Sequence, residues 1–350
     1  MSVDEFLAEW HSDSPYVEVK TSGSTGEPKP MLVEKRRMLA SARRTNDFLG
    51  LQEGDTALLC MSLDYIAGKM MVVRALERGL KLVCVEPSGH PLAIQGAVTQ
   101  SGQSPNVEFP SVESPCVDFA AMVPMQVYNS LQVPEERERL RRIRHLIIGG
   151  GAVDERLAET LKAFPNNVWS TYGMTETLSH IALRRLSGPE ASEWYTPFPT
   201  VKVCVNEEGC LVIDAPEVCA ERLVTNDIAE LSTQTGQSPC VVFRILGRKD
   251  NVICSGGIKI QAEEVERLLR PHLRVPYLIS KRPDEKFGEA VVLLTEGDTA
   301  EAQAVCEEVL QKFLRPRAYV HVSRIPLTET GKPARRQAEM LICPTSRSSS

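Results

Sequence analysis

A short segment near the start of the chain combines hydroxyl groups, glycines and a lysine. Its candidate phosphate-binding residues are Thr21, Ser22, Gly23, Ser24, Thr25, Gly26 and Lys29. Glycines allow bare backbone amides to approach an anion, the hydroxyls donate hydrogen bonds, and the lysine adds a positive charge. A triphosphate requires such groups, so the segment predicts phosphate binding.

A flexible surface loop is the alternative interpretation, because loops rich in Ser, Thr and Gly are common. The segment is not a Walker loop, since Gly26 is followed by Glu27 and no Gly-Lys-Ser/Thr sequence closes it. Composition alone leaves both interpretations open.

Two further polar segments follow apolar runs that predict strands. The run 145–148 leads into Gly149, Gly150 and Gly151, and the run 167–170 leads into Thr171, Tyr172, Gly173, Met174, Thr175 and Glu176. Ligands of α/β proteins bind at such strand ends, and an aromatic ring, a hydroxyl and a carboxylate suit a nucleotide. A capped helix start is the alternative for the second segment.

The surrounding pattern predicts how these segments are positioned. Strand and helix patterns alternate at 16–20 (strand), 38–49 (helix), 56–61 (strand), 67–78 (helix), 80–85 (strand) and 119–131 (helix). This order predicts an α/β fold with a parallel sheet covered by helices. A period of two over 201–245 predicts a β-rich region, and a small α+β unit follows. We expect a large domain over residues 1–249 and a small one over 250–345.

Composition excludes several function classes. The chain has 350 residues, with 40 Lys plus Arg against 46 Asp plus Glu, a net charge of −6 that provides no broad basic surface for nucleic acid. No apolar run approaches the roughly 18 residues of a membrane span, so no membrane insertion is expected. The acidic start lacks the pattern of an export signal, which favours a cytoplasmic location. Histidine spacing gives no support to a zinc site.

Four later segments, 171–177, 225–227, 247–260 and 328–332, follow Ser22–Lys29. In this order the five segments resemble the signatures of the acyl-adenylate-forming superfamily of AMP-binding acyl-CoA synthetases. The resemblance spans about residues 16–337. It implies a layered α/β large domain, a β-rich segment and a small mobile α+β domain. The chain is short for this superfamily, so we expect the large domain to be shortened at its amino terminus.

The resemblance implies a role for each matching residue. Tyr172 would lie on adenine, Thr175 near the α-phosphate, and Glu176 would hold Mg²⁺. Asp227 would accept hydrogen bonds from the ribose, although Asn226 departs from the family's glycine. The predicted ATP- and AMP-binding residues are the phosphate-segment residues above together with Gly149, Gly150, Gly151, Thr171, Tyr172, Gly173, Asp227 and Arg248.

The remaining implied roles lie in the small domain. Arg248 would be a second ribose contact and Asp250 the hinge, while Ser255, Gly256 and Gly257 would line the coenzyme A channel. Lys332 would bridge ATP and the acyl carboxylate as the catalytic lysine, with Thr175 and Glu176 as its catalytic partners.

The implied activity is an acid–thiol ligation. A carboxylate is a poor electrophile, so it first displaces pyrophosphate from ATP, and the thiol of coenzyme A then attacks the acyl-AMP. ATP, Mg²⁺ and coenzyme A are the expected cofactors and small-molecule partners. The oligomeric state is left open, with a homodimer among the alternatives.

Within this superfamily, the segments 61–68, 123–126 and 175–180 resemble those of the short 2-succinylbenzoate:CoA ligases of menaquinone synthesis. It implies that Tyr65, Lys69, Ser179 and His180 line the acid pocket, with Tyr65 standing where those ligases have histidine. A ligase for another small acid and a noncatalytic nucleotide-binding relative remain alternatives.

Overall fold

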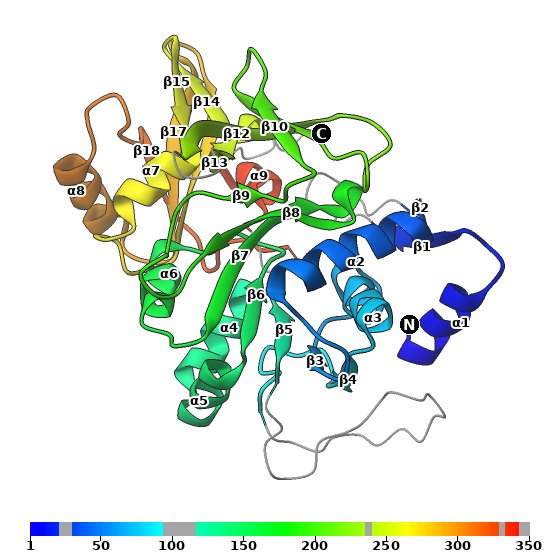
Figure 1. Cartoon of the computed structure of the whole chain (residues 1–350). Coiled ribbons are helices and arrows are strands. Elements are labelled where there is room, and N and C mark those ends of the chain that lie inside the picture. Colours follow the sequence, from blue (N-terminus) through cyan, green and yellow to red (C-terminus); the bar gives the residue numbers. More distant parts are fainter. Residues whose placement is uncertain (21–29, 94–116, 235–239, 329–332, 343–350) are drawn as a thin grey trace, which may run out of the picture. The chain divides into compact units, whose positions relative to one another are not determined.

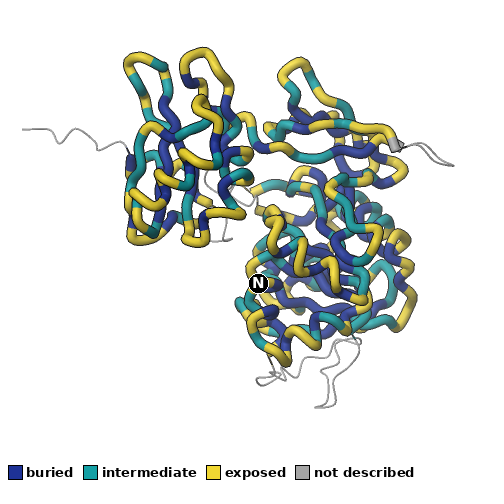
Figure 2. The backbone as a smooth tube through the Cα atoms, turned by 90° about the vertical axis from the view of Figure 1, so that its left-hand side faces the viewer, coloured by how far each residue is buried: buried dark blue, intermediate teal, exposed yellow. Residues whose placement is uncertain are grey.

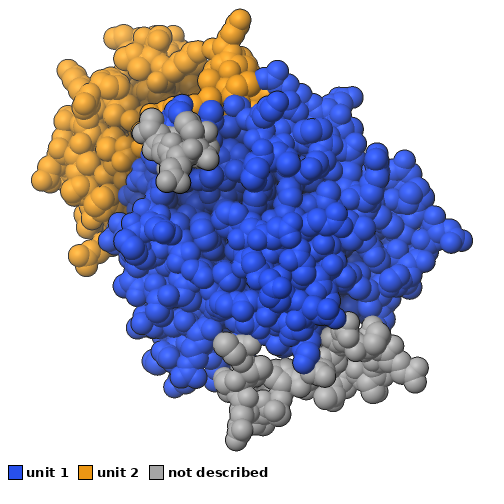
Figure 3. Space-filling view, in the orientation of Figure 1, with its two compact units in different colours: residues 1–203, 213–223, 232–243 blue, residues 204–212, 224–231, 244–350 orange. Residues whose placement is uncertain are grey.

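The computed structural model describes residues 1–20, 30–93, 117–234, 240–328 and 333–342. The chain divides into two compact units (Figure 3). Unit 1 comprises residues 1–203, 213–223 and 232–243, and unit 2 the remainder. Because 204–212 and 224–231 group with the C-terminal part, the domain boundary after residue 249 stays a prediction.

A seven-stranded sheet forms the centre of unit 1 (Figure 1). Its order is β4 (Lys81–Cys84), β3 (Thr56–Leu59), β5 (Phe119–Met122), β6 (His145–Ile148), β7 (Asn167–Met174), β8 (Ser179–Arg185) and β9 (Thr196–Pro197). Strands β4, β3, β5, β6 and β7 run parallel to one another. Strand β8 pairs antiparallel with both β7 and β9. The predicted parallel sheet is therefore confirmed.

Helices flank this sheet. They are α1 (Val3–His11), α2 (Lys35–Leu49), α3 (Ile66–Arg78), α4 (Pro124–Gln132), α5 (Pro134–Arg142) and α6 (Glu155–Lys162). On one face, Leu146 and Ile148 of β6 share a buried cluster with Leu140 of α5 and Leu157 of α6. Helix α3 packs against α2 and contacts β3, β4 and β8. A separate hairpin pairs β1 (Tyr16–Lys20) with β2 (Pro30–Glu34).

The predicted helix over 119–131 is wrong in its first part. Phe119–Met122 is the buried strand β5, and the helix begins only at Pro124. A run of four apolar residues fits a buried strand or a buried helix equally well in the sequence. Proline favours the first helical position, so Pro124 marks where the strand has already ended.

Four strands carry the predicted β-rich region: β10 (Lys202–Val205), β11 (Cys210–Asp214), β12 (Leu223–Gln234) and β13 (Cys240–Arg248). They form one sheet in chain order. The division of the chain into units runs through these strands.

Unit 2 contains a second sheet, of β14 (Val252–Ser255), β15 (Ile258–Gln261), β16 (Tyr277–Asp284), β17 (Gly288–Thr295) and β18 (Ala318–His321). Its helices are α7 (Ala262–Leu269), α8 (Thr299–Val309) and α9 (Arg335–Ile342). Val291 and Leu293 of β17 pack with α7 and α8, whereas Val292 packs with α9, so helices cover both faces. Figure 2 shows where the buried residues, in dark blue, lie along the backbone.

Gly68 fixes the approach of α3 to the turn before it. A Cβ at this position would lie 2.3 Å from the carbonyl oxygen of Ser62, which is backbone and cannot rotate away. Only glycine therefore allows α3 to begin where it does.

We expect Gly68→Ala to lower the free energy of unfolding by about 1–3 kcal/mol, the usual cost of overpacking. Gly151→Ala is the matched control, because its Cβ would meet only Pro124 at 3.6 Å. Urea denaturation of both variants measures the difference. Equal stabilities would contradict the assigned contact.

Candidate active site

The hairpin between β7 and β8 carries most of the predicted nucleotide residues. Its strands pair up to Met174 and Ser179, with a register shift between Tyr172 and Gly173. A Cβ at Gly173 would lie 2.1 Å from the carbonyl oxygen of Ser179, so glycine is required where the backbones meet. The alternative interpretation of this segment, a capped helix start, corresponds in the structure to a single 3-10 turn, η1 (Thr175–Thr177).

Thr175 and Glu176 face different surroundings within this turn. Thr175 is buried and Glu176 is exposed, while the Glu176 backbone oxygen accepts a hydrogen bond from Cys219 Sγ at 3.3 Å. The described residues form no cluster of three His, Cys, Asp or Glu side chains that could hold a metal. Mg²⁺ typically binds one or two carboxylates plus substrate phosphates and water, so a single exposed carboxylate fits the predicted role of Glu176.

An aromatic cluster surrounds Tyr172. Its ring centroid lies 5.1 Å from that of Phe243 and 5.8 Å from that of Tyr195. Tyr195 stacks on Phe243 at 5.5 Å, and its hydroxyl lies 2.9 Å from Ser170 Oγ. The cluster fixes the plane of Tyr172, the predicted adenine contact. The sequence analysis missed Tyr195 and Phe243, which lie in no motif.

The glycines after β6 lie beside this hairpin. Thr171 Oγ1 is 2.4 Å from the place where a Cβ of Gly149 would stand, and it donates a hydrogen bond to Ile148 O at 3.3 Å. The structure thus brings Gly149 to Thr171, as expected for strand ends that share one edge of a sheet, whereas Gly150 and Gly151 lie beside Val123 and Pro124.

Two of the four predicted acid-pocket residues, Ser179 and His180, lie together with a buried arginine of α3. Arg74 Nη2 donates to Ser179 Oγ at 2.8 Å, and Ser179 Oγ lies 3.2 Å from His180 Nδ1. His180 Nε2 lies 3.0 Å from Thr45 Oγ1 of α2. Arg74 was missed because an arginine in an amphipathic helix usually lies on its solvated face.

Burial sets the protonation of these groups. His180 is 4% exposed, and burial followed by the charges of Arg74 and Arg44 lowers its pKa well below the ordinary 6.5. Arg74 is 1% exposed, and burial lowers its pKa to about 9. His180 is therefore neutral, and Arg74 retains its charge at neutral pH.

The other two predicted pocket residues have different surroundings. Lys69 Nζ donates to Glu18 O at 2.6 Å and lies 3.6 Å from a carboxylate oxygen of Glu9. Tyr65 is the residue before α3 and forms a backbone bridge with Lys20. The structure does not bring Lys69 into contact with Ser179 or His180, and both pocket roles stay predictions.

The ribose and hinge residues gather in unit 2. Arg248 Nη1 lies 3.4 Å from Asp227 Oδ1, and its Nη2 donates to Asp250 Oδ2 at 3.0 Å. Asn226, which replaces the family's glycine, donates to the same Asp250 oxygen at 3.3 Å. The predicted ribose contacts thus form one cluster, while their roles and the hinge at Asp250 stay predictions.

The predicted coenzyme A residues occupy the turn between β14 and β15. Ser255 is buried, and the backbone N–H of Gly256 donates to Phe287 O at 2.8 Å, while Gly257 is exposed. Thr21, Ser22, Gly23, Ser24, Thr25, Gly26, Lys29 and the catalytic Lys332 lie outside the described residues. Their roles stay predictions.

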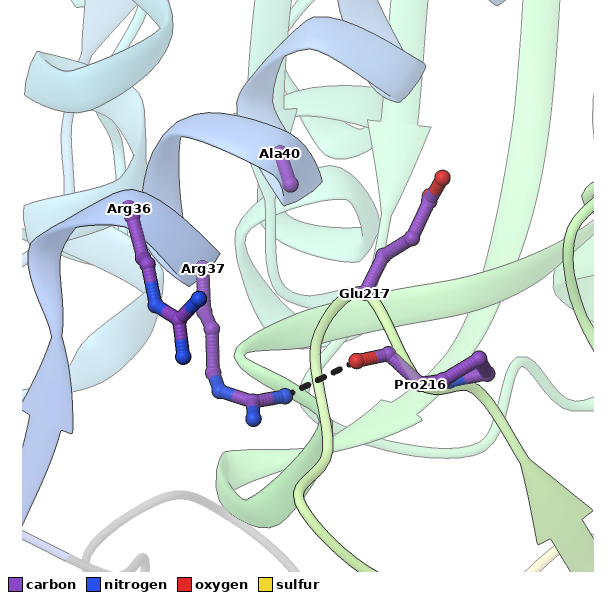
Figure 4. Close-up of a pocket in the computed structure, with 5 residues that line it drawn as sticks. All are labelled: Arg36, Arg37, Ala40, Pro216 and Glu217. Carbon is purple, nitrogen blue, oxygen red and sulfur yellow. Dashed lines mark hydrogen bonds between the residues drawn. The ribbon is translucent and has the colours of Figure 1, made fainter.

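A cavity of about 250 Å³ lies beside the first turn of α2 (Figure 4). Its described lining residues are Arg36, Arg37, Ala40, Pro216 and Glu217, none of which the sequence analysis selected. Arg37 Nη1 donates to Pro216 O at 2.9 Å, and both arginines pair with Glu34. The charges of this cavity are thus largely compensated.

The comparison with protein families decides the family. The model of the AMP-binding enzyme family matches residues 4–218, more than half of the chain. The chain belongs to the AMP-binding enzyme family. The site residues from Tyr65 to His180 all lie inside the matched range.

Named relatives agree with this membership. The chain is 26% identical to a 2-succinylbenzoate–CoA ligase of Bacillus cytotoxicus, covering 93% of this chain and 69% of the relative. It is 31% identical to an acyl-CoA synthetase (AMP-forming)/AMP-acid ligase II-like protein of Dyadobacter fermentans, with a TM-score of 0.60 and coverage of 97% and 92%. The predicted fold class and enzyme class, an acid–thiol ligase of the acyl-CoA synthetase type, are confirmed.

A solved relative also bears on the cofactors. The O-succinylbenzoate coenzyme A synthetase of Bacillus subtilis was solved with ATP and a magnesium ion; it is 22% identical, with a TM-score of 0.68 and coverage of 91% and 69%. ATP, Mg²⁺ and coenzyme A, as predicted, are the cofactors and substrates of this enzyme class. Within the described ranges, the structure contains no helix with the length and apolar character of a membrane span.

The neutral state of His180 predicts a pH dependence of stability. The unfolded chain protonates this ring below about pH 6.5, whereas the folded chain does not. The unfolded state then binds more protons, so the free energy of unfolding falls as the pH drops through 6.5, with a slope that approaches about 1.4 kcal/mol per pH unit at lower pH.

We expect His180→Asn to lose this contribution, which denaturation between pH 7 and 5.5 measures. His272→Asn, at an exposed ring, is the control and keeps the wild-type slope. Parallel slopes for wild type and His180→Asn would contradict the prediction.

Proposed function

We propose that the protein joins 2-succinylbenzoate to coenzyme A through an acyl-adenylate, as a cytoplasmic enzyme of menaquinone synthesis. The names of several relatives, at 24–26% identity over 93% of this chain, support this substrate. One observation in the structure supports it independently, namely the buried charge of Arg74.

Arg74 is a buried cation without a counter-ion among the described residues. Its polar contacts there are Ser179 Oγ at 2.8 Å and Met71 Sδ at 3.8 Å, and its Nε has no hydrogen-bond partner. An isolated buried charge is costly, whereas a guanidinium pairs strongly with a carboxylate. The arrangement favours a substrate with two carboxylates, one activated by ATP and the other bound by Arg74.

The nucleotide residues serve the activation step in this proposal. Tyr172 binds the adenine face, Thr175 donates to a phosphate oxygen, and Asp227 with Arg248 orients the ribose. When bound at Glu176, Mg²⁺ would neutralise phosphate charge. Lys29 and Lys332 bring the anionic acid and the phosphates together, because two anions otherwise repel each other.

An acid panel tests the proposed substrate. We expect CoA thioester and pyrophosphate from 2-succinylbenzoate with ATP and Mg²⁺, and neither product from benzoate or medium-chain fatty acids. Turnover of another acid instead would retain the ligase and reject the substrate. Absence of pyrophosphate with every acid would favour a noncatalytic relative.

Replacing Arg74 separates its recognition role from stability. We expect Arg74→Met to lower kcat/KM for 2-succinylbenzoate about 30-fold or more, the usual effect of removing one partner of a buried charge pair. Stability should be equal or higher, because a buried unpaired charge is removed. Arg36→Met is the control, since its side chain is 78% exposed. An unchanged kcat/KM for Arg74→Met would reject the role.

A further inference from the structure

The turn that carries Ser179 is strained. Leu178 and Ser179 have φ angles of 54° and 115°, which residues other than glycine rarely adopt. Such a conformation persists only where its surroundings enforce it. Two contacts do so: Ser41 Oγ of α2 donates to Leu178 O at 3.0 Å, and Thr177 Oγ1 donates to Ser179 O at 2.6 Å.

The hydrogen bonds around His180 depend on one hydroxyl proton, that of Thr45 Oγ1, which reaches Ser41 O at 3.2 Å and His180 Nε2 at 3.0 Å. With this proton on Ser41 O, as in other helices where a threonine bonds back to the carbonyl four residues earlier, Thr45 Oγ1 accepts from His180 Nε2. A neutral imidazole protonated at Nε2 has its lone pair at Nδ1. Nδ1 then accepts the hydroxyl proton of Ser179 at 3.2 Å.

This direction determines what Ser179 presents to Arg74. With its proton turned toward His180, the Ser179 oxygen offers a lone pair to Arg74 Nη2 at 2.8 Å. Both ring nitrogens of His180 are thereby occupied, so neither is left to bond to the substrate.

We propose that His180, held by Thr45 as the Nε2–H tautomer, is a positioning residue that orients Ser179 and so aims Arg74 at the second carboxylate of the acid. The kinetic part of this inference rests on the proposed function. The tautomer and its dependence on Thr45 do not.

The first experiment is ¹⁵N NMR of the histidine ring in the full-length protein. The wild type should show His180 neutral, with Nε2 protonated. Thr45→Val keeps the side-chain shape but removes the acceptor, so the Nδ1–H tautomer should become populated. Thr45→Ser should restore the wild-type pattern. Thr160→Val, at an exposed threonine of α6 with a similar bond to its own helix, is the matched control and should leave His180 unchanged.

The second experiment separates positioning from general damage. We expect Thr45→Val to raise KM for 2-succinylbenzoate about tenfold, as for a misplaced hydrogen-bonded charge. KM for ATP, and for 4-oxo-4-phenylbutanoate, which lacks the ring carboxylate, should not change.

An Nδ1–H tautomer or a protonated ring in the wild type would overturn the proposal, as would equal KM increases for both acids. If the wild type does not use 2-succinylbenzoate, the proposed substrate fails, while the NMR result still decides the tautomer and its anchor.

Discussion

The close approach of Gly173 to the Ser179 carbonyl is the constraint on which the candidate site depends. Because the backbones meet there, the register of the hairpin shifts at Tyr172, and the chain turns through Thr175–Thr177 before it returns as β8. The ring of Tyr172 lies among other aromatic rings before the turn, and Ser179 and His180 lie against α2 and α3 after it. One short contact thus positions both the predicted nucleotide residues and two of the predicted acid-pocket residues.

Arg74, Ser179 and His180 form the acid end of the candidate site, which lies in an apolar environment. Protonation and hydrogen-bond direction are both constrained there. His180 stays neutral, and Arg74 keeps its charge with a hydroxyl as its strongest partner among the described residues. An environment that disfavours charge in the empty protein strengthens the attraction for a carboxylate that enters. The structural cost of Arg74 and the binding role proposed for it therefore have the same origin.

Much of the fold could be predicted, because hydrophobic period and glycine turns are local signals. The parallel strands and α3 follow their patterns closely, whereas the sequence predicts helix where β5 lies, because four apolar residues carry no period of their own. Motifs located the hairpin and the Asp227–Arg248 pair. Arg74, Tyr195 and Phe243 could not be found, since their importance comes from neighbours more than 20 residues away along the chain.

The contacts that form the acid end also join distant parts of the chain. Ser41 bonds to Leu178 across 137 positions, Thr45 to His180 across 135, and Arg74 to Ser179 across 105. Closing such long loops costs chain entropy before any contact repays it. During folding, this corner must therefore assemble after the helices and local strand pairs.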